Sequence, residues 1–161
     1  MDIRLATLDD AEAIAAIYNL EVQTSTATFD LVPRSVPEQR EWLAARSGAL
    51  SAIVATEHGE VVGFASLSLY KERPGYRTTV EDSVYVRRDH HGQGVGKALL
   101  AELLDVARAV GFHAVMARIE STREPSIALH RSCGFDTVGT EREVGRKFNR
   151  FLDVTIMQKL L

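Results

Sequence analysis

Three glycines at alternate positions form the segment of this sequence that most directly suggests chemistry. The segment reads Gly92-Gln93-Gly94-Val95-Gly96 and lies between a β-prone stretch and a stretch with helical periodicity. Glycines at a strand-to-helix turn let the backbone approach a ligand closely, and free amides at a helix N-terminus favour negative charge. The segment is therefore predicted to bind a phosphate group; the alternative is a glycine-rich connection without a ligand.

Two common phosphate-binding motifs do not match this segment. A dinucleotide fingerprint starting at Gly92 requires glycine at position 97, where the chain has Lys97. A P-loop ending at Gly96-Lys97 requires glycine at position 91 and serine or threonine at position 98, where the chain has His91 and Ala98. The spacing excludes both motifs.

The elements that must position the loop indicate one mixed α/β domain. Leu99, Leu103, Val106 and Val110 recur at helical spacing after the loop, and Gly111 is a natural C-cap. A chain of 161 residues is long enough for one globular domain and short for two. Further helices are expected over residues 9–22, 37–47 and 125–132. Strands are expected over residues 2–6, 51–57, 61–69, 78–86, 113–119 and 151–161, and another strand is expected after the turn at Gly134-Phe135.

The composition excludes several classes of protein. With 19 basic and 22 acidic side chains the net charge is −3, which provides no bulk attraction to nucleic acid or anionic lipid. No apolar window is long enough to span a membrane, and the N-terminus does not read as a secretory signal. The single cysteine, Cys133, suits a reducing compartment, and the histidines match no zinc-ligand spacing. We expect a cytoplasmic protein without a metal and with neither nucleic acid nor membrane as a partner.

The segment from His91 to Gly96, preceded by the strand Ser83–Arg87, resembles the acyl-CoA loop of the GNAT (GCN5-related) N-acetyltransferases. The order of elements also resembles that fold. The resemblance implies a single α/β (α+β) domain over residues 1–161, with a mixed, mostly antiparallel sheet of about seven strands flanked by about four helices. It also implies acetyl-CoA as cosubstrate and, as is frequent in the family, a homodimer, with the loop before Tyr76 at the interface.

Other segments are similar to the phosphinothricin acetyltransferase branch of this family. They are Gln23–Phe29, Tyr76–Val86, Pro125-Ser126 with His130, Gly134-Phe135, and the tail residues Gly145, Lys147, Asp153-Val154 and Gln158. This similarity implies transfer of acetyl to the α-amino group of a small amino-acid-like substrate, such as phosphinothricin, methionine sulfoximine or methionine sulfone. The chain departs from the branch at His91, Arg123 and Phe151-Leu152, where an Arg or Gln, an Asn and a Trp-His pair are expected.

The resemblance assigns two regions to acetyl-CoA. The backbone of the strand before the loop is expected to pair with pantetheine, and the amides of the loop are expected to hold the pyrophosphate. The residues expected at the cofactor are Val84, Tyr85, Val86, His91, Gly92, Gln93, Gly94, Val95, Gly96, Lys97, Arg123 and Ser126.

Acetyl transfer to an amine needs a base for the ammonium proton and benefits from an acid for the departing thiolate. Glu81 is the predicted base; the alternative is a solvent-facing carboxylate paired with Arg77. Asp82 points to the opposite face of a regular strand, so at most one of the two can serve. His130 is the predicted acid, because a histidine can donate a proton near neutral pH; the alternative is a histidine that fills space. No motif activates Cys133, which favours direct transfer in a ternary complex.

Substrate recognition needs a cation for the carboxylate and an apolar wall. Lys71, Arg73 and Tyr76 are predicted for the first task and Phe29 for the second; the alternatives are solvated loop charges and a core phenylalanine. Two rival functions stay open at this point. One is acetylation of another amine, such as a polyamine, an aminoglycoside or a protein N-terminus, and the other is a CoA-binding module without catalysis.

Overall fold

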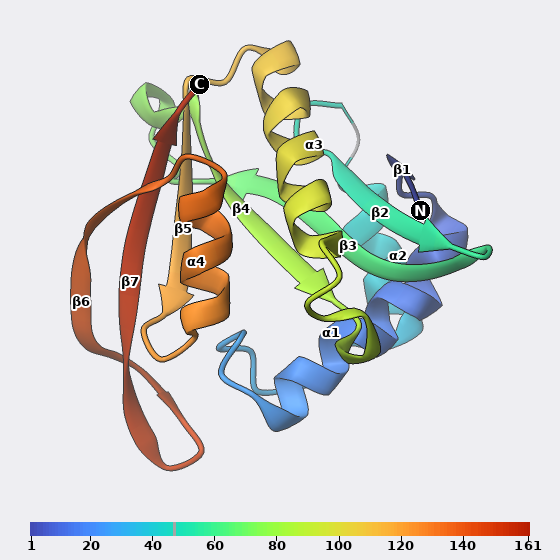
Figure 1. Cartoon of the computed structure of the whole chain (residues 1–161), viewed down its shortest axis with the longest axis horizontal. Helices are drawn as coiled ribbons and strands as arrows, with labels where there is room; N and C mark the ends of the chain where they lie inside the picture. The colour runs from blue at the N-terminus through green and yellow to red at the C-terminus, as the bar shows by residue number, and fades with distance from the viewer. Residues whose placement is uncertain (47) are drawn as a thin grey trace.

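Seven strands form one mixed sheet in the order β1-β2-β3-β4-β5-β7-β6. The computed structural model describes residues 1–46 and 48–161. All neighbouring strands are antiparallel except β4 and β5, which run parallel, and the predicted fold class is confirmed (Figure 1). The strands are β1 (Asp2–Leu5), β2 (Ala52–Glu57), β3 (Glu60–Leu69), β4 (Thr79–Val86), β5 (Ala114–Glu120), β6 (Asp136–Lys147) and β7 (Arg150–Leu160), and the helices are α1 (Ala11–Thr24), α2 (Val36–Ala44), α3 (Val95–Val110) and α4 (Glu124–Ser132).

The sheet opens between β4 and β5. Strand β4 pairs with β3 as far as Val86, but its pairing with β5 stops at Glu81. Strand β5 continues to pair with β7 as far as Glu120. Beyond Glu81 the two central strands therefore diverge, as Figure 1 shows, and each keeps a backbone edge that no strand covers.

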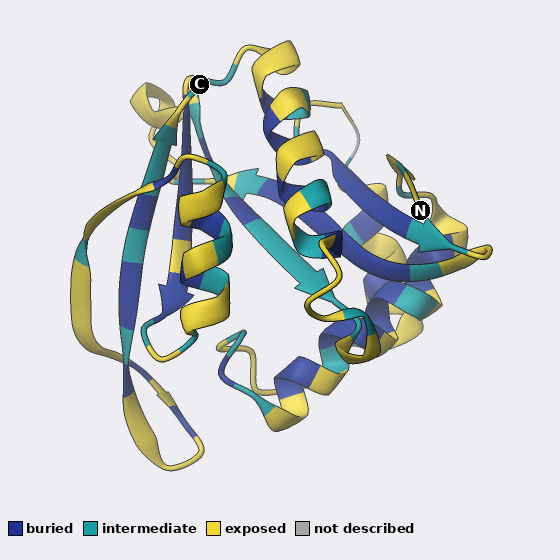
Figure 2. Cartoon of the chain, viewed as in Figure 1, coloured by how far each residue is buried: buried dark blue, intermediate teal, exposed yellow. Residues whose placement is uncertain are grey.

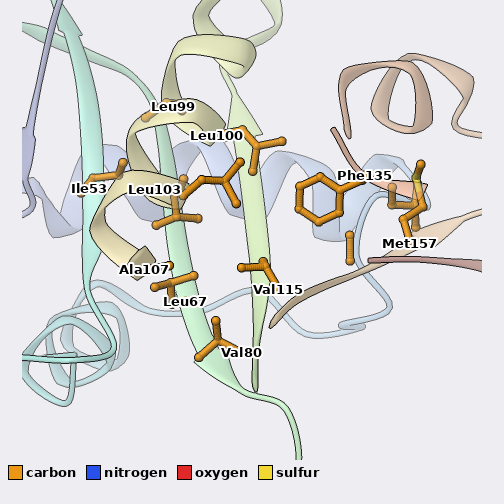
Figure 3. Packing of buried hydrophobic residues seen from close by; sticks show 14 of the residues in the cluster. Ile53, Leu67, Val80, Leu99, Leu100, Leu103, Ala107, Val115, Phe135 and Met157 are labelled. Carbon is orange, nitrogen blue, oxygen red and sulfur yellow. The ribbon is translucent and has the colours of Figure 1, made fainter. Parts of the chain in front are cut away.

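Helices cover both faces of the sheet, because side chains alternate along each strand. On β2 and β3, Val54 and Phe64 belong to the apolar cluster of α1 and α2, whereas Ile53 and Ala65 belong to the cluster of α3. Figure 3 shows this second cluster, in which α3 packs its buried side chains onto the sheet. The buried stripes alternate with exposed ones along the helices in Figure 2.

Most predicted elements are confirmed, with shifts at their ends. The helix after the glycine loop begins after Gly94 and ends at Gly111, both with positive φ (84° and 101°) that favours glycine. Its buried stripe ends at Ala107, and Val110, which was expected to continue it, is exposed. The second helix ends at Ala44, and the predicted end at position 47 lies outside the described residues. Among the described residues, no helix has both the length and the apolar composition that a bilayer crossing requires.

Candidate active site

A cavity of about 590 Å³ lies where β4 and β5 diverge. Strand β4 supplies one wall, from Asp82 to Val86, and the glycine loop with the first turn of α3 supplies a second. The end of β5 and helix α4 close the opposite side. All residues predicted at the cofactor line this cavity except Gln93, whose side-chain amide donates to the carbonyl of Asp89 at 3.1 Å.

The glycine loop has the geometry of an anion cradle. Gly92 and Gly94 have φ of 73° and 84°, which side chains other than glycine rarely adopt, and a Cβ at either would meet open space. The first amides of α3 have no partner within the helix and lie at its positive end. His91, where the family pattern has Arg or Gln, donates from Nε2 to the carbonyl of Val86 at 2.8 Å. Its ring therefore ties the loop to the end of β4.

Two cations of the cavity are available to a phosphate-bearing ligand. Lys97 and Arg123 line it, and neither side chain makes a hydrogen bond or ion pair within the described part of the chain. The carboxylates of the cavity, by contrast, have partners. Glu21 accepts from the Arg88 guanidinium at 2.9 Å, and Glu120 accepts hydrogen bonds from two threonines, Thr26 and Thr122. The free charge at this wall is thus positive, as CoA phosphates require.

His130 and Asp82 form a buried pair beside the cavity. The His130 Nε2 atom lies 3.0 Å from Asp82 Oδ1, and Nδ1 lies 2.7 Å from the carbonyl of Ser126. The ring also packs edge-on against Phe135 with centroids 5.0 Å apart. Burial alone would lower the pKa of His130, but the hydrogen bond and charge of Asp82 and the Ser126 carbonyl outweigh it, so the pKa is raised.

Glu81, the predicted base, lies on the other face of β4 and does not line the cavity. Its Oε1 is 3.8 Å from Nε of Arg118 rather than paired with Arg77. Burial raises the pKa of Glu81, the Arg118 charge opposes this, and the neighbouring Asp82 charge adds to it. Arg118 itself lines the cavity and connects it to this carboxylate. The role of Glu81 as the base stays a prediction.

The predicted substrate residues lie outside this cavity. Lys71, Arg73 and Tyr76 precede β4, whereas the glycine loop follows β4, so they lie at its opposite end. The Lys71 ammonium lies 5.1 Å from the centroid of the Tyr76 ring, a cation–π contact. Phe29 covers Gly145 so closely that a Cβ there would not fit. These four residues are not among those that line the cavity of the predicted cofactor residues, and their contact with the substrate stays a prediction.

The sequence reasoning missed three features of this site. It did not place Glu21, Arg118 or Glu120 at the cavity. Glu21 carried a signal, since it follows Ile14, Ile17 and Tyr18 on the apolar face of α1, where a charged residue needs a buried partner. Glu120 and Arg118 carried none, because only the divergence of the strands exposes the end of β5.

An uncovered strand edge beside a helix N-terminus, with a buried His–Asp pair in the same cavity, is an arrangement suited to binding an elongated phosphate-bearing cofactor. The cradle and the two unpaired cations fit acetyl-CoA. Residues 14–135 match the Acetyltransferase (GNAT) family. The chain belongs to this family and is an acetyl-CoA-dependent N-acetyltransferase. In the described residues, no cluster of His, Cys, Asp or Glu is arranged to hold a metal ion.

Relatives and solved structures are similar over nearly the whole chain. An L-methionine sulfoximine/L-methionine sulfone acetyltransferase from Pseudomonas aeruginosa is 42% identical over 158 residues, which cover 97% of this chain and 92% of that protein. A phosphinothricin N-acetyltransferase from Streptomyces coelicolor is 38% identical over 165 residues, covering 100% and 96%. A phosphinothricin acetyltransferase from Sinorhizobium meliloti, solved in complex with acetyl-CoA, has a TM-score of 0.95 and 36% identity, covering 99% and 88%. A ribosomal-protein-alanine N-acetyltransferase from Brucella melitensis has a TM-score of 0.98 and 41% identity, covering 100% of both chains.

Proposed function

We propose that this enzyme acetylates the α-amino group of a small amino-acid-like substrate of the methionine sulfoximine, methionine sulfone or phosphinothricin type. The observation that carries the proposal is the 42% identity, over 97% of the chain, to a methionine sulfoximine/methionine sulfone acetyltransferase. The segments Gln23–Phe29 and Tyr76–Val86, which are similar to that branch, flank the divergence of β4 and β5.

Different residues of the chain bind the cosubstrate and transfer protons in this proposed reaction. The amides of residues 92–97, with Lys97 and Arg123, hold the phosphates, and the free edge of β4 holds the extended arm of the cosubstrate. Acetyl-CoA supplies the acetyl thioester. Glu81 takes the proton of the substrate ammonium, through water, and His130 returns one to the leaving sulfur. Transfer is direct in a ternary complex, a proposal supported by Cys133, which does not line the cavity.

The charges of the cavity favour an amino-acid-like acceptor over a polyamine. A polyamine needs carboxylates that are free to bind its ammonium groups. The three carboxylates of the described cavity, Glu21, Asp82 and Glu120, are engaged by Arg88, by His130 and by threonine hydroxyls respectively. The described cavity therefore offers no unengaged carboxylate to a polycation.

A second candidate substrate is a protein N-terminus. The ribosomal-protein-alanine N-acetyltransferase that shares 41% identity with this chain favours it. A peptide that begins with alanine therefore belongs in the same assay as the small amino acids.

Release of the CoA thiol is the direct test of these alternatives. We expect saturable turnover with methionine sulfoximine, methionine sulfone or phosphinothricin, and little with spermidine or with the alanine peptide. Glu81→Gln and His130→Ala should both lower kcat. Turnover on spermidine or the peptide alone would replace the substrate class, and binding of acetyl-CoA without turnover on any amine would indicate a CoA-binding module.

We also propose that the enzyme is a cytoplasmic homodimer that binds neither nucleic acid nor membranes. The loop before Tyr76 supports the interface, because Leu69 and Tyr76 are both exposed apolar residues at this end of the sheet. The net charge of −3 supports the absence of polyanionic partners. Sedimentation of the wild type and of Leu69→Asp tests the dimer, since a charge in the interface should shift the variant toward monomer.

A further inference from the structure

The surroundings of His130 require a proton on both ring nitrogens. Its Nδ1 faces the backbone carbonyl of Ser126, one turn earlier on α4, and its Nε2 faces both carboxylate oxygens of Asp82 at 3.0 and 3.2 Å. A carbonyl and an ionised carboxylate accept hydrogen bonds and donate none. With Asp82 ionised, only the imidazolium form satisfies both contacts, and the neutral ring would leave one nitrogen lone pair facing an acceptor.

This charge pair is sequestered from solvent. The side chains of His130 and Asp82 are 4% and 3% exposed, so water screens their interaction little. The other charged or titratable groups that line the cavity are Glu21, His90, His91, Lys97, Arg118, Glu120 and Arg123, and Glu81 lies on the far face of β4. None of them hydrogen-bonds to the ring, so Asp82 is its ionic partner among the described residues.

We propose that Asp82 is a positioning residue that holds His130 as an imidazolium, ready to protonate the departing CoA sulfur. The inference rests on the proposed function and adds a residue to it. The proton leaves Nε2 as the bond between hydrogen and sulfur forms, and the ring is left neutral with its Nδ1–H still on Ser126. The substrate ammonium loses two protons in the reaction. One, carried by water, restores Nε2 and the contact with Asp82, and the other goes to solvent.

The raised pKa suits this step. Asp82 and the Ser126 carbonyl raise the pKa of His130, so the ring stays protonated to a higher pH than an ordinary histidine and can donate to the departing thiolate. The pair also explains why neighbouring carboxylates have separate tasks. Glu81 and Asp82 point to opposite faces of β4, and only the Asp82 face is covered by α4.

Asp82→Asn is the decisive variant, because it keeps the shape of the side chain and removes the charge. The new amide can donate to Nε2 and hold the ring neutral. We expect a lower kcat, an alkaline limb of the kcat profile displaced to lower pH by about one to three units, and little change in the KM for acetyl-CoA. Asp105→Asn, at an exposed residue of α3 paired with Arg108, is the matched control and should leave the profile unchanged.

Two further measurements separate positioning from mere structure. Titration of the His130 ring by NMR should show its pKa falling in Asp82→Asn and keeping its value in Asp105→Asn, whether or not any amine is acetylated. In a His130→Gln background, Asp82→Asn should cause no further loss of kcat, because the group it acts through is gone.

The outcomes distinguish the failure of each proposal. An alkaline limb or a ring titration unchanged in Asp82→Asn would overturn the role of Asp82, provided that the wild type turns over an amine. If Asp82→Asn fails to fold, Asp82→Glu, which keeps the carboxylate, should retain the wild-type ring titration, and a fall in the pKa there would refute the proposal. A wild type that acetylates no amine would overturn the proposed function and with it the acid role of His130.

Discussion

Thr26 joins the segment after α1 to strand β5 through one buried hydrogen bond. Its hydroxyl donates to Glu120 Oε1 at 2.8 Å, and the two residues are 6% and 5% exposed. Thr26→Val keeps the shape of the side chain and removes this donor. A hydrogen bond to a charged group contributes about 1.5–3 kcal/mol to stability. Because Glu120 keeps its donors from Thr122, we expect a loss at the low end, about 1.5 kcal/mol.

Equilibrium unfolding in urea measures this loss directly. For a chain of this length, a loss of about 1.5 kcal/mol lowers Tm by about 3–6 °C. Ala27, the next residue, lines the cavity, so loosening the segment should also raise the KM for the amine. Thr56→Val is the control, because its hydroxyl makes only a long, exposed contact of 3.5 Å with the carbonyl of Asp2. If Thr26→Val were as stable as the control within about 0.5 kcal/mol, the assigned role of this hydrogen bond would be wrong.

Three other substitutions test packing and charges at the cavity and elsewhere in the chain. Gly96→Val adds bulk where a Cβ would already lie 3.3 Å from a side chain of α4. The free energy of unfolding in urea should fall by about 1–3 kcal/mol, and the KM for acetyl-CoA should rise. An unchanged KM would contradict the placement of the cofactor. Lys147→Met removes the buried donor to the carbonyl of Thr28 at 2.8 Å. The free energy of unfolding should fall by about 1–3 kcal/mol, and a variant as stable as the wild type would refute the stabilising role of this hydrogen bond. The Arg4 hydrogen bonds hold the pKa of Asp10 below its ordinary value. Asp10→Asn should therefore lose about 1 kcal/mol of stability, a modest amount because Arg4 is half exposed, and this loss should be full above pH 4 and vanish as the pH falls through the folded-state pKa of Asp10. A difference in stability that persists at low pH would show another cause.

Much of the fold could be predicted from the sequence, because many of its features depend on residues that are close together in the chain. The hairpin of β2 and β3 follows from two apolar, β-prone stretches around His58-Gly59, where both residues have positive φ. The bounds of α3 follow from Gly94 and Gly111, since few residues other than glycine adopt the left-handed backbone at those positions. Such features depend on neighbours within a few residues, and for that reason they can be predicted without the fold.

The cradle could be predicted for the same reason. The spacing from Gly92 to Gly96 sets which amides are free, and the same spacing excludes the dinucleotide and P-loop motifs. Resemblance to a family then supplied the chemistry. The residues assigned to the cofactor on that basis, Gln93 aside, line one cavity.

The assignment of the carboxylates needed the tertiary structure. Alternation along β4 separates Glu81 from Asp82, but it does not tell which face α4 will cover. His130 lies 48 residues away from Asp82, and only the packing of α4 against the diverging strands brings them within 3.0 Å. The positions of Glu21 and Glu120 at the cavity depend on the same divergence.

The sequence by itself thus determined the elements, the phosphate cradle and, through resemblance, the family, because each of these is written in short stretches of chain. Only the tertiary structure decided which side chains share a cavity, which of them are buried, and therefore which carry a charge. Burial and pairing set protonation, and both are properties of residues that meet from distant parts of the chain. Lys71 illustrates the limit, because its type suits a substrate carboxylate, but its place at the far end of β4 keeps it outside the cavity of its own chain.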